Sequence, residues 1–316
     1  MTKVAVVQAA SVGFDPDATL DKAEGLVATA AAAGADLVVF PEAFLGGYPK
    51  GSAFGAVVGA REPSGFGEFG RYAAGGSELP GPTSERLGGI AAAAGVHLSS
   101  GVIERRGGTL YSSAVLLDDR GELLAVRRKL MPTGAERLVW GFADGSTIDV
   151  QETALGRIGT VICWESYMPL LRSAMYAKGV ELYIAPTADS RDRWLATVRH
   201  IALEGRCYVI SANQFARRAD LPADHPGAEG EDGEAVLAAG GSCVVDPFGE
   251  VIAGPVHGEE AILYAEVDLA RVAEAKYDFD PVGHYSRPDV FQLRVDVTPR
   301  PPVSFLSAPE PEDSLD

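Results

Sequence analysis

Three residues with reactive side chains, Glu42, Lys129 and Cys163, each follow a stretch that predicts a β-strand. These stretches are rich in aliphatic and β-branched residues and cover residues 37–41, 123–128 and 157–162. A thiol, a carboxylate and an amine are groups that proteins use for nucleophilic and acid–base catalysis. Because ligands of α/β proteins bind beyond the strand ends, the three side chains are candidates for one active site.

Each of these residues also has a simpler interpretation. A glutamate after a strand is usually a solvated loop residue, and a lysine that follows two arginines is typical of a charged strand end. A cysteine after a β-branched strand is more often a small hydrophobic residue of the core. Their spacing alone therefore leaves both interpretations open for all three residues.

The chain of 316 residues carries 44 acidic and 27 basic residues, which give a formal net charge of -17. Such a surface repels phosphate backbones and anionic lipids, which argues against nucleic-acid and membrane partners. No apolar run approaches the roughly 18 residues that span a bilayer. A strand-like segment starts almost at the N-terminus and leaves no room for a signal peptide. We therefore expect a cytoplasmic protein.

The three cysteines, Cys163, Cys207 and Cys243, are widely spaced and odd in number. The sequence contains no CxxC pair and no cysteine–histidine cluster with the spacing of metal ligands. We therefore expect neither a disulfide framework nor a metal site, and two of the three cysteines should be buried hydrophobic residues.

Short apolar strands alternate with helices rich in alanine and leucine, which is typical of an α/β protein. Strands are predicted near residues 3–9, 35–40, 97–104, 110–117, 122–128, 147–151, 157–163, 181–185, 207–212, 242–245, 251–253 and 261–267, and helices over 16–34, 83–94, 169–178 and 192–205. A turn at 118–121 predicts a hairpin, so the sheet should be mixed. No linker divides the chain. Residues 216–234 resemble a surface insertion, and 307–313 a disordered acidic tail.

Three longer motifs surround the reactive residues. They are FPEAFLGGYPKG at 40–51, RKLMPT at 128–133 followed by ERLVWG at 136–141, and CWESYMPLLR at 163–172. Together they resemble, in the same order, the three catalytic blocks of the nitrilase family of carbon-nitrogen hydrolases. Further matches at 199–205, 240–247 and 282–289 extend the resemblance over residues 3–290.

The resemblance implies an α/β fold that is a four-layer αββα sandwich with mixed sheets, in one domain over residues 1–290 and an extension at 291–316. It implies a general base at Glu42, a cationic stabiliser at Lys129 and a nucleophile at Cys163. It also implies that Glu136 holds the lysine and positions the substrate. Ala135 departs from the family pattern, in which many members have a polar residue before this glutamate.

The chemistry implied is hydrolysis of a nitrile to a carboxylic acid and ammonia, through a thioimidate and then a thioester on Cys163. An ammonium about 4 Å from a thiolate contributes roughly 4 kcal/mol at an effective dielectric near 20, so we expect Lys129 to favour the thiolate. Tyr48 and Trp164 are candidate substrate-pocket residues, although plain aromatic packing explains them as well. No metal or organic cofactor is expected.

Sibling reactions remain open at this stage. A cyanide dihydratase, an aliphatic amidase or a carbamoylase would use the same glutamate, lysine and cysteine, although the CWE and ERLVWG motifs favour the nitrile-cleaving branch. A non-catalytic assembly protein on this fold is less compatible with an intact set of reactive residues. The family resemblance also implies a homodimer or larger homo-oligomer, such as a spiral or filament, with residues 55–74 and 216–234 as candidate contact surfaces.

Overall fold

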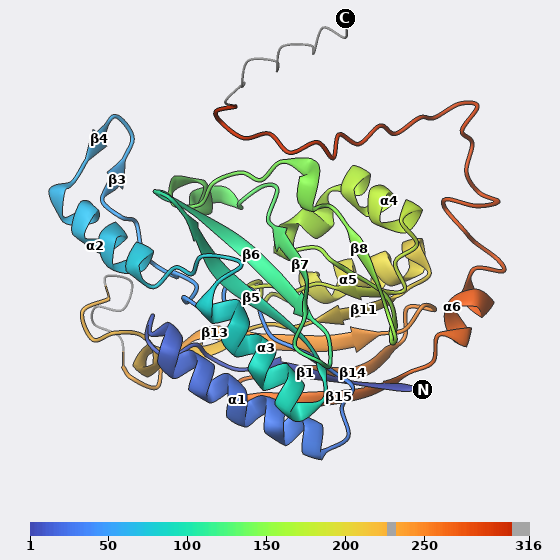
Figure 1. Ribbon diagram of the computed structural model, residues 1–316, viewed down its shortest axis with the longest axis horizontal. Coiled ribbons are helices and arrows are strands. Elements are labelled where there is room, and N and C mark those ends of the chain that lie inside the picture. The colour runs from blue at the N-terminus through green and yellow to red at the C-terminus, as the bar shows by residue number, and fades with distance from the viewer. Residues whose placement is uncertain (226–231, 305–316) are drawn as a thin grey trace, which may run out of the picture.

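The computed structural model describes residues 1–225 and 232–304 of the chain. Its two large β-sheets stack face to face, and helices cover both outer faces (Figure 1). The first sheet has the order β15-β1-β2-β5-β6-β7. Its strands are β1 (Thr2–Gln8), β2 (Leu37–Val39), β5 (His97–Arg106), β6 (Thr109–Leu117), β7 (Leu123–Arg128) and β15 (Ala261–Val267).

The second sheet has the order β12-β13-β11-β10-β9-β8, and β14 pairs with β13. Its strands are β8 (Val150–Thr153), β9 (Gly156–Thr160), β10 (Leu182–Ile184), β11 (Tyr208–Ser211), β12 (Phe215–Arg217), β13 (Val236–Val245) and β14 (Val251–His257). Both sheets are mixed. In the first, β1, β2 and β5 are parallel to one another; in the second, β9, β10 and β11 are.

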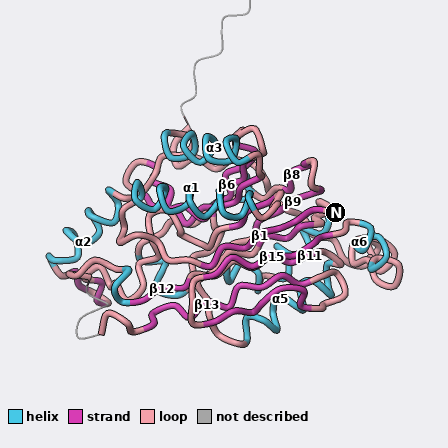
Figure 2. Tube along the Cα trace, turned by 90° about the horizontal axis from the view of Figure 1, so that it is seen from below, coloured by secondary structure: helices cyan, strands magenta, loops and turns pink. Residues whose placement is uncertain are grey.

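The outer layers consist of α1 (Pro16–Ala32) and α3 (Pro82–Ala94) on one side and of α4 (Pro169–Ala177) and α5 (Arg193–Gly205) on the other. Two further helices, α2 (Pro63–Ala74) and α6 (Ala270–Ala275), lie at opposite ends of the sandwich (Figure 2). Figure 2 shows α1 and α3 on one side of the stacked sheets and α5 on the other. The predicted αββα sandwich is therefore confirmed.

Successive side chains of a strand point to opposite faces of its sheet, which explains why the core has three apolar layers, one between the sheets and one between each sheet and its helices. In β1, Val4 and Val6 face the second sheet, whereas Ala5 and Val7 pack under α1 and α3. In β10, Leu182 and Ile184 face the first sheet, and Tyr183 packs against α4 and α5. Strands that are buried on both faces need apolar residues at every position, which is why these runs are continuously hydrophobic.

Several predicted boundaries differ from the structure. No helix or strand is predicted in the region 51–76, but it contains the hairpin β3 (Ala56–Val57) and β4 (Ala60–Arg61), followed by α2. Helix α3 begins at Pro82, and Ser84 bonds back to the Gly81 backbone from inside the first turn. Strand β9 ends at Thr160, three residues earlier than predicted.

The predicted surface insertion is only partly described. Residues 216–234 include the end of β12 and a short 3-10 helix (Arg218–Asp220), and residues 226–231 lie outside the described residues. The acidic segment 307–313 also lies outside them. Residues 291–304 contain neither helix nor strand, and the domain boundary at residue 290 stays a prediction. Within 1–225 and 232–304, no helix is long and apolar enough to cross a membrane.

Candidate active site

The ends of strands from both sheets carry the reactive side chains. Glu42 follows β2, and Lys129 is the first residue after β7, so both belong to the first sheet. Cys163 begins a 3-10 helix (Cys163–Tyr167) that follows β9 of the second sheet. The Gln214 side chain, which follows β11, donates to the Glu42 backbone oxygen at 2.7 Å and joins the two sheets at this edge.

Lys129 lies between two carboxylates. Its Nζ atom is 2.7 Å from Glu42 Oε1 and 2.7 Å from Glu136 Oε2, and the Lys129 and Glu42 side chains are fully buried. The same nitrogen lies 5.6 Å from the centre of the Trp140 ring. An ammonium has three N–H donors, so these two ion pairs leave one donor for a bound molecule.

Glu136 is fixed by three hydrogen bonds. Besides the Lys129 bond, its Oε1 accepts from the Tyr48 hydroxyl at 2.7 Å, and its Oε2 accepts from the Thr133 backbone N–H at 2.6 Å. Tyr48 also packs edge-on against Trp140, with ring centroids 5.7 Å apart. The local hydrogen bonding of Glu136 is therefore complete even though Ala135 supplies no polar group.

Burial and neighbouring charges shift the acidity of these groups. Burial raises the pKa of Glu42, Lys129 opposes this effect, and the Glu136 charge adds to it, so the net direction is upward. Burial would lower the pKa of Lys129, but the two carboxylates outweigh it and keep the lysine charged. Within the described residues, Glu42 Oε2 is buried and accepts no hydrogen bond.

As expected from the sequence, the Lys129 charge favours the thiolate of Cys163, but other effects on the pKa of this thiol are larger. Burial raises its pKa, the Glu42 charge raises it further, and Lys129 only partly compensates. Lys129 exerts this effect while it forms its ion pairs with the two carboxylates. The net direction of the pKa of the Cys163 thiol is upward, which favours a mechanism in which a base removes its proton as it reacts.

The backbone at Cys163 has an unusual conformation. Its φ is 55°, in the left-handed region that non-glycine residues rarely adopt. The Cys163 N–H donates to the Pro186 backbone oxygen at 2.8 Å. A strained residue held by its surroundings is typical of a functional position, because the surrounding contacts fix where the side chain points.

Glu165 connects the segment that carries Cys163 with the segment that carries Lys129. Its Oε2 accepts from the Ile162 N–H at 3.0 Å, and its Oε1 accepts from the Leu130 N–H at 2.6 Å. The Arg127 guanidinium donates to Oε1 at 3.0 Å. One fully buried carboxylate therefore sets the distance between the two catalytic segments, which come from different sheets.

Thr187 was not identified from the sequence. It follows β10, is fully buried, and its hydroxyl donates to Cys163 Sγ at 3.1 Å. The signal that could have found it is the one that found the other three, because Thr187 and Asp189 are polar residues shortly after the predicted strand at 181–185.

A cavity of about 240 Å³ opens beside Cys163. Its lining includes Tyr48, Glu136 and Trp164, so the predicted pocket residues lie together. The Trp164 indole N–H donates to Asp189 Oδ2 at 2.9 Å, and the Arg191 guanidinium stacks over the indole ring at 4.9 Å from its centre. These contacts fix the Trp164 ring at the mouth of the cavity.

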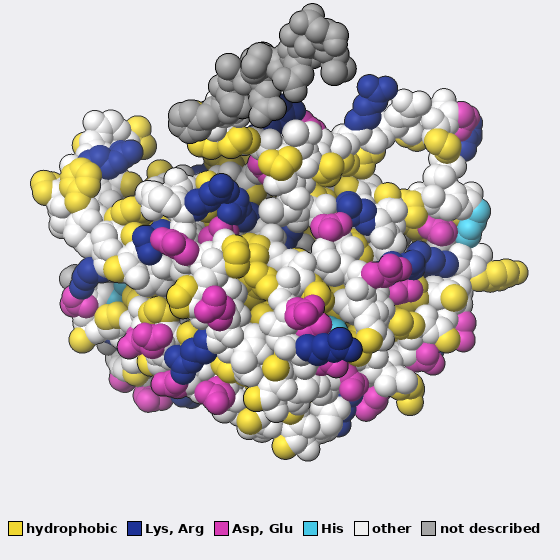
Figure 3. All heavy atoms as spheres, viewed as in Figure 1, with side chains coloured by type: hydrophobic (Ala, Val, Ile, Leu, Met, Phe, Trp, Pro, Cys, Tyr) yellow, Lys and Arg dark blue, Asp and Glu magenta, His cyan; other side chains and the backbone are white. Residues whose placement is uncertain are grey.

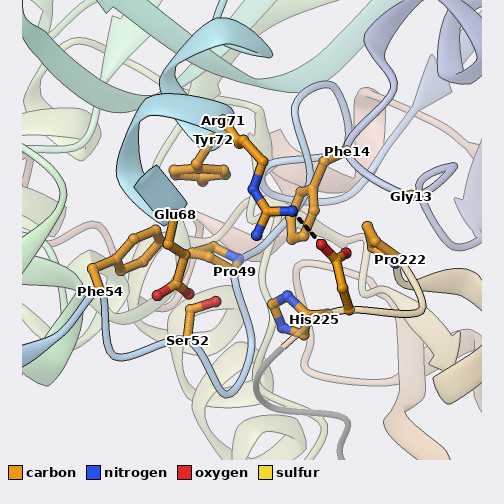
Figure 4. A pocket seen from close by; sticks show the side chains of 11 residues that line it. Gly13, Phe14, Pro49, Ser52, Phe54, Glu68, Arg71, Tyr72, Pro222 and His225 are labelled. Carbon is orange, nitrogen blue, oxygen red and sulfur yellow. Dashed lines mark hydrogen bonds and ion pairs between the residues drawn. The ribbon is translucent and has the colours of Figure 1, made fainter. Parts of the chain in front are cut away.

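A second hollow of about 210 Å³ is lined in part by Pro49, the residue that follows Tyr48 in the chain (Figure 4). Its lining includes Phe14, Arg71 and Tyr72 but none of the reactive residues described above. The Tyr72 hydroxyl donates to the Gly47 backbone oxygen at 3.0 Å and accepts from Trp140 Nε1 at 3.2 Å. The ring that lines this hollow therefore supports the wall of the catalytic cavity.

Comparison with known proteins agrees with this arrangement. The sequence profile of the carbon-nitrogen hydrolase family matches residues 3–277. The chain belongs to the carbon-nitrogen hydrolase family. The hydrolase is 54% identical over 302 residues to an aliphatic nitrilase of Sinorhizobium fredii, an alignment that covers 95% of this chain and 98% of the relative. It is 52% identical to a bifunctional nitrilase/nitrile hydratase of Nicotiana tabacum, over 99% of this chain and 91% of that one.

Solved structures share the fold of the hydrolase. A carbon-nitrogen hydrolase from Helicobacter pylori superposes with a TM-score of 0.71 at 24% identity, covering 92% of this chain and 96% of the other. An amidase from Nesterenkonia sp. gives 0.64 at 21% identity, covering 86% and 92%. At these identities the likeness concerns the fold alone.

Proposed function

We propose that the enzyme hydrolyses an organic nitrile to the carboxylic acid and ammonia, with Cys163 as the nucleophile. The named nitrilases at 52% and 54% identity support nitrile hydrolysis over the amidase, carbamoylase and cyanide dihydratase alternatives. The observation that carries the residue roles is the buried Glu42–Lys129–Glu136 chain next to the cavity that Cys163 lines. The coreactants are a small nitrile and water.

In the first step the Cys163 sulfur attacks the nitrile carbon. The thiol proton passes to Glu42, whose Oε2 has no other partner among the described residues, and then to the nitrile nitrogen. The carbon–sulfur bond forms as one carbon–nitrogen π bond breaks, which gives a thioimidate. The remaining Lys129 N–H stabilises the negative charge that develops on nitrogen, and removing such a donor typically costs about 10²–10³ in rate.

Two water molecules complete the reaction. Glu42 takes a proton from the first water, whose oxygen adds to the thioimidate carbon, and the proton is returned as ammonia leaves. A thioester remains on Cys163. The second water adds in the same way, and the carbon–sulfur bond breaks to release the acid and restore the thiol. The net reaction consumes one nitrile and two waters.

The residue roles can be tested by substitution. We expect Cys163→Ala to abolish turnover while the protein keeps its fold and assembly, because the alanine only removes a buried sulfur. Glu42→Gln and Lys129→Ala should each lower kcat/KM by about 10²-fold or more, since one removes the base and the other the charge-stabilising donor. Full activity of the Cys163 variant, or a loss below tenfold in either of the others, would contradict the assigned role.

The substrate class needs a separate experiment. Ammonia release is measured from a panel of aliphatic, arylaliphatic and aromatic nitriles, from cyanide, and from the matching amides. We expect turnover of organic nitriles, with acid and amide quantified separately. Efficient amide turnover without nitrile turnover would instead indicate an amidase.

We also propose that the chain forms a homodimer or a larger homo-oligomer. Apolar side chains stand exposed on the hairpin β3–β4, on α2 and along the extended segment 285–303; among them are Val58, Phe66, Tyr285 and Phe291. Figure 3 shows hydrophobic side chains on the projection that this hairpin and the start of α2 form. Exposed apolar patches of this kind are typical of protein contact surfaces.

Light scattering after size exclusion tests the assembly. Val58→Asp and Phe291→Asp should each lower the mass of the particle, because a charge in an apolar interface must be desolvated. A monomeric wild type would refute the proposal. We further propose a cytoplasmic location, which the three free cysteines support, since disulfides form mainly in oxidising compartments.

A further inference from the structure

The peptide around Thr187 is held in place from both sides. Its N–H donates to the Ala212 backbone oxygen at 2.9 Å, which continues the pairing of β10 with β11 beyond the strand ends. The oxygen of the preceding residue, Pro186, accepts from the Cys163 N–H at 2.8 Å. Thr187 and Cys163 are therefore fixed in register across two neighbouring strands of one sheet.

The direction of the Thr187 hydroxyl proton follows from its partners. Its oxygen accepts a hydrogen bond from the Asp189 N–H at 3.0 Å, which occupies a lone pair and leaves the single proton free to donate. The Cys163 sulfur, at 3.1 Å, is the partner to which it donates. The side chain is fully buried, so water does not compete for this proton.

The groups that face the sulfur differ in the charge they bring. Glu42 and Glu136 disfavour a negative sulfur, and Lys129 favours it from within its two ion pairs. Tyr48 and Arg191 also interact with it electrostatically. The Thr187 hydroxyl is the neutral group that donates a hydrogen bond directly to the sulfur.

We propose that Thr187 is a catalytic residue that stabilises the negative sulfur of Cys163, both when it attacks and when it leaves. The proposal rests on the proposed role of Cys163 as the nucleophile. During attack, the hydrogen bond strengthens as the thiol loses its proton to Glu42. During breakdown of an intermediate, the same bond helps the carbon–sulfur bond to break, because a more stable thiolate leaves faster.

The stabilisation of the leaving sulfur by Thr187 affects which product is formed. The first tetrahedral intermediate carries OH, NH₂ and the Cys163 sulfur on one carbon. If the carbon–nitrogen bond breaks, ammonia leaves and the thioester forms; if the carbon–sulfur bond breaks, the amide leaves and the thiolate takes up a proton. Thr187 favours the amide exit because its hydrogen bond stabilises the sulfur as the leaving group.

The test compares Thr187→Val, which removes the hydroxyl at nearly constant volume, with Thr187→Ser, which keeps it. The readout is the rate at which Cys163 reacts with methyl methanethiolsulfonate near neutral pH, located by peptide mass spectrometry and with Cys163→Ser as the blank. A hydrogen bond to a charged group shifts a pKa by about one unit, so the valine variant has about tenfold less thiolate. Its thiolate is about threefold more nucleophilic, which leaves a net slowing of about threefold.

We expect the serine variant to react at the wild-type rate. A merely structural role would give the opposite sign in the valine variant, because loosened packing exposes Cys163 and speeds its modification. An unchanged or faster rate in Thr187→Val would therefore overturn the proposal. If the valine variant fails to fold, Thr187→Ala serves in the same comparison.

A second readout uses a nitrile from which the wild type releases measurable amide. The ratio of amide to acid should fall by about threefold in Thr187→Val and recover in Thr187→Ser, whereas general damage slows both products equally. An increase in the ratio would contradict the proposal. If Cys163→Ala kept nitrile turnover, the proposed function would fail, and the modification rates would still test the hydrogen bond from Thr187.

Discussion

Glu136→Gln offers a quantitative test of the electrostatics of the site. The substitution keeps the shape of the side chain and removes its charge. A glutamine oxygen can still accept from Lys129 and from the Thr133 N–H, so the loop stays in place. What changes is the repulsion between two carboxylates that share one ammonium, Glu42 and Glu136.

The size of this repulsion follows from the geometry. Both carboxylate oxygens lie 2.7 Å from one nitrogen, so they are at most about 5.4 Å apart. Two like charges at that distance, with an effective dielectric near 20, repel by about 3 kcal/mol. This corresponds to about two pKa units. Because a neighbouring negative charge disfavours ionisation, its removal lowers the pKa of Glu42.

The pH dependence of kcat/KM measures this change. Its acid limb reports the protonation of the essential base in the free enzyme, so the limb should move to lower pH by about two units in Glu136→Gln. The plateau should fall by about tenfold, because a less basic Glu42 removes protons less effectively. Glu122→Gln, an exposed residue at the opposite end of β7 from Lys129, is the matched control and should change neither. A lower plateau with an unmoved acid limb would refute the electrostatic reasoning and leave Glu136 a purely supporting role.

Three other substitutions test the surroundings of the site. Burial alone would raise the pKa of Glu204, but hydrogen bonds, first of all from Arg172, have the larger effect, so the net pKa is lowered. The ionised Glu204 side chain therefore stabilises the folded protein at pH values above the usual pKa of a glutamate, about 4.3. Glu204→Gln should therefore lower Tm by about 2 °C at neutral pH, and the Tm difference between wild type and variant should shrink as the pH falls below 4. Thermal unfolding at several pH values measures this, and a Tm difference that does not change with pH would contradict the prediction. Glu165→Gln leaves the buried Arg127 without a charged partner, which costs about 3–5 kcal/mol of stability, so both Tm and kcat/KM should fall. A variant with unchanged kcat/KM would show that catalysis does not need the connection that Glu165 makes between the Cys163 and Lys129 segments. Trp164→Ala should shift kcat/KM toward bulkier nitriles by about tenfold, measured on a series of increasing size, whereas equal losses across the series would argue against its place at the cavity mouth.

The strands that carry the site could be predicted because they are buried on both faces. Runs such as 37–40 and 182–185 are continuously apolar, and side chains that follow such a run lie at the edge of the sheet. The region 51–76 could not be predicted in the same way, since helix α2 contains three glycines, which disfavour helices. Gly65 is explained only by tertiary packing, because a Cβ there would lie 2.2 Å from the Phe54 backbone oxygen.

The finer details of the site depend on contacts between distant segments. The motif around Glu42 indicates a base, but its raised pKa results from burial and from Glu136, 94 positions later in the chain. The left-handed backbone of Cys163 and its hydrogen bond from Thr187 result from the register of β9 and β10. Residue types can suggest such roles, whereas only the folded sheets set the distances.

The two sheets also divide the chemistry between them. Glu42 and Lys129 come from one sheet, Cys163 and Thr187 from the other, and apolar side chains such as Ile210 fill the space between the sheets. The turnover rate should therefore depend sensitively on the relative position of the two sheets. Ile210→Val, which touches no substrate, costs only about 0.5–1.5 kcal/mol in stability. A shift of about 1 Å between base and nucleophile can cost about 10²-fold in rate, so activity should register small movements of the sandwich long before it unfolds.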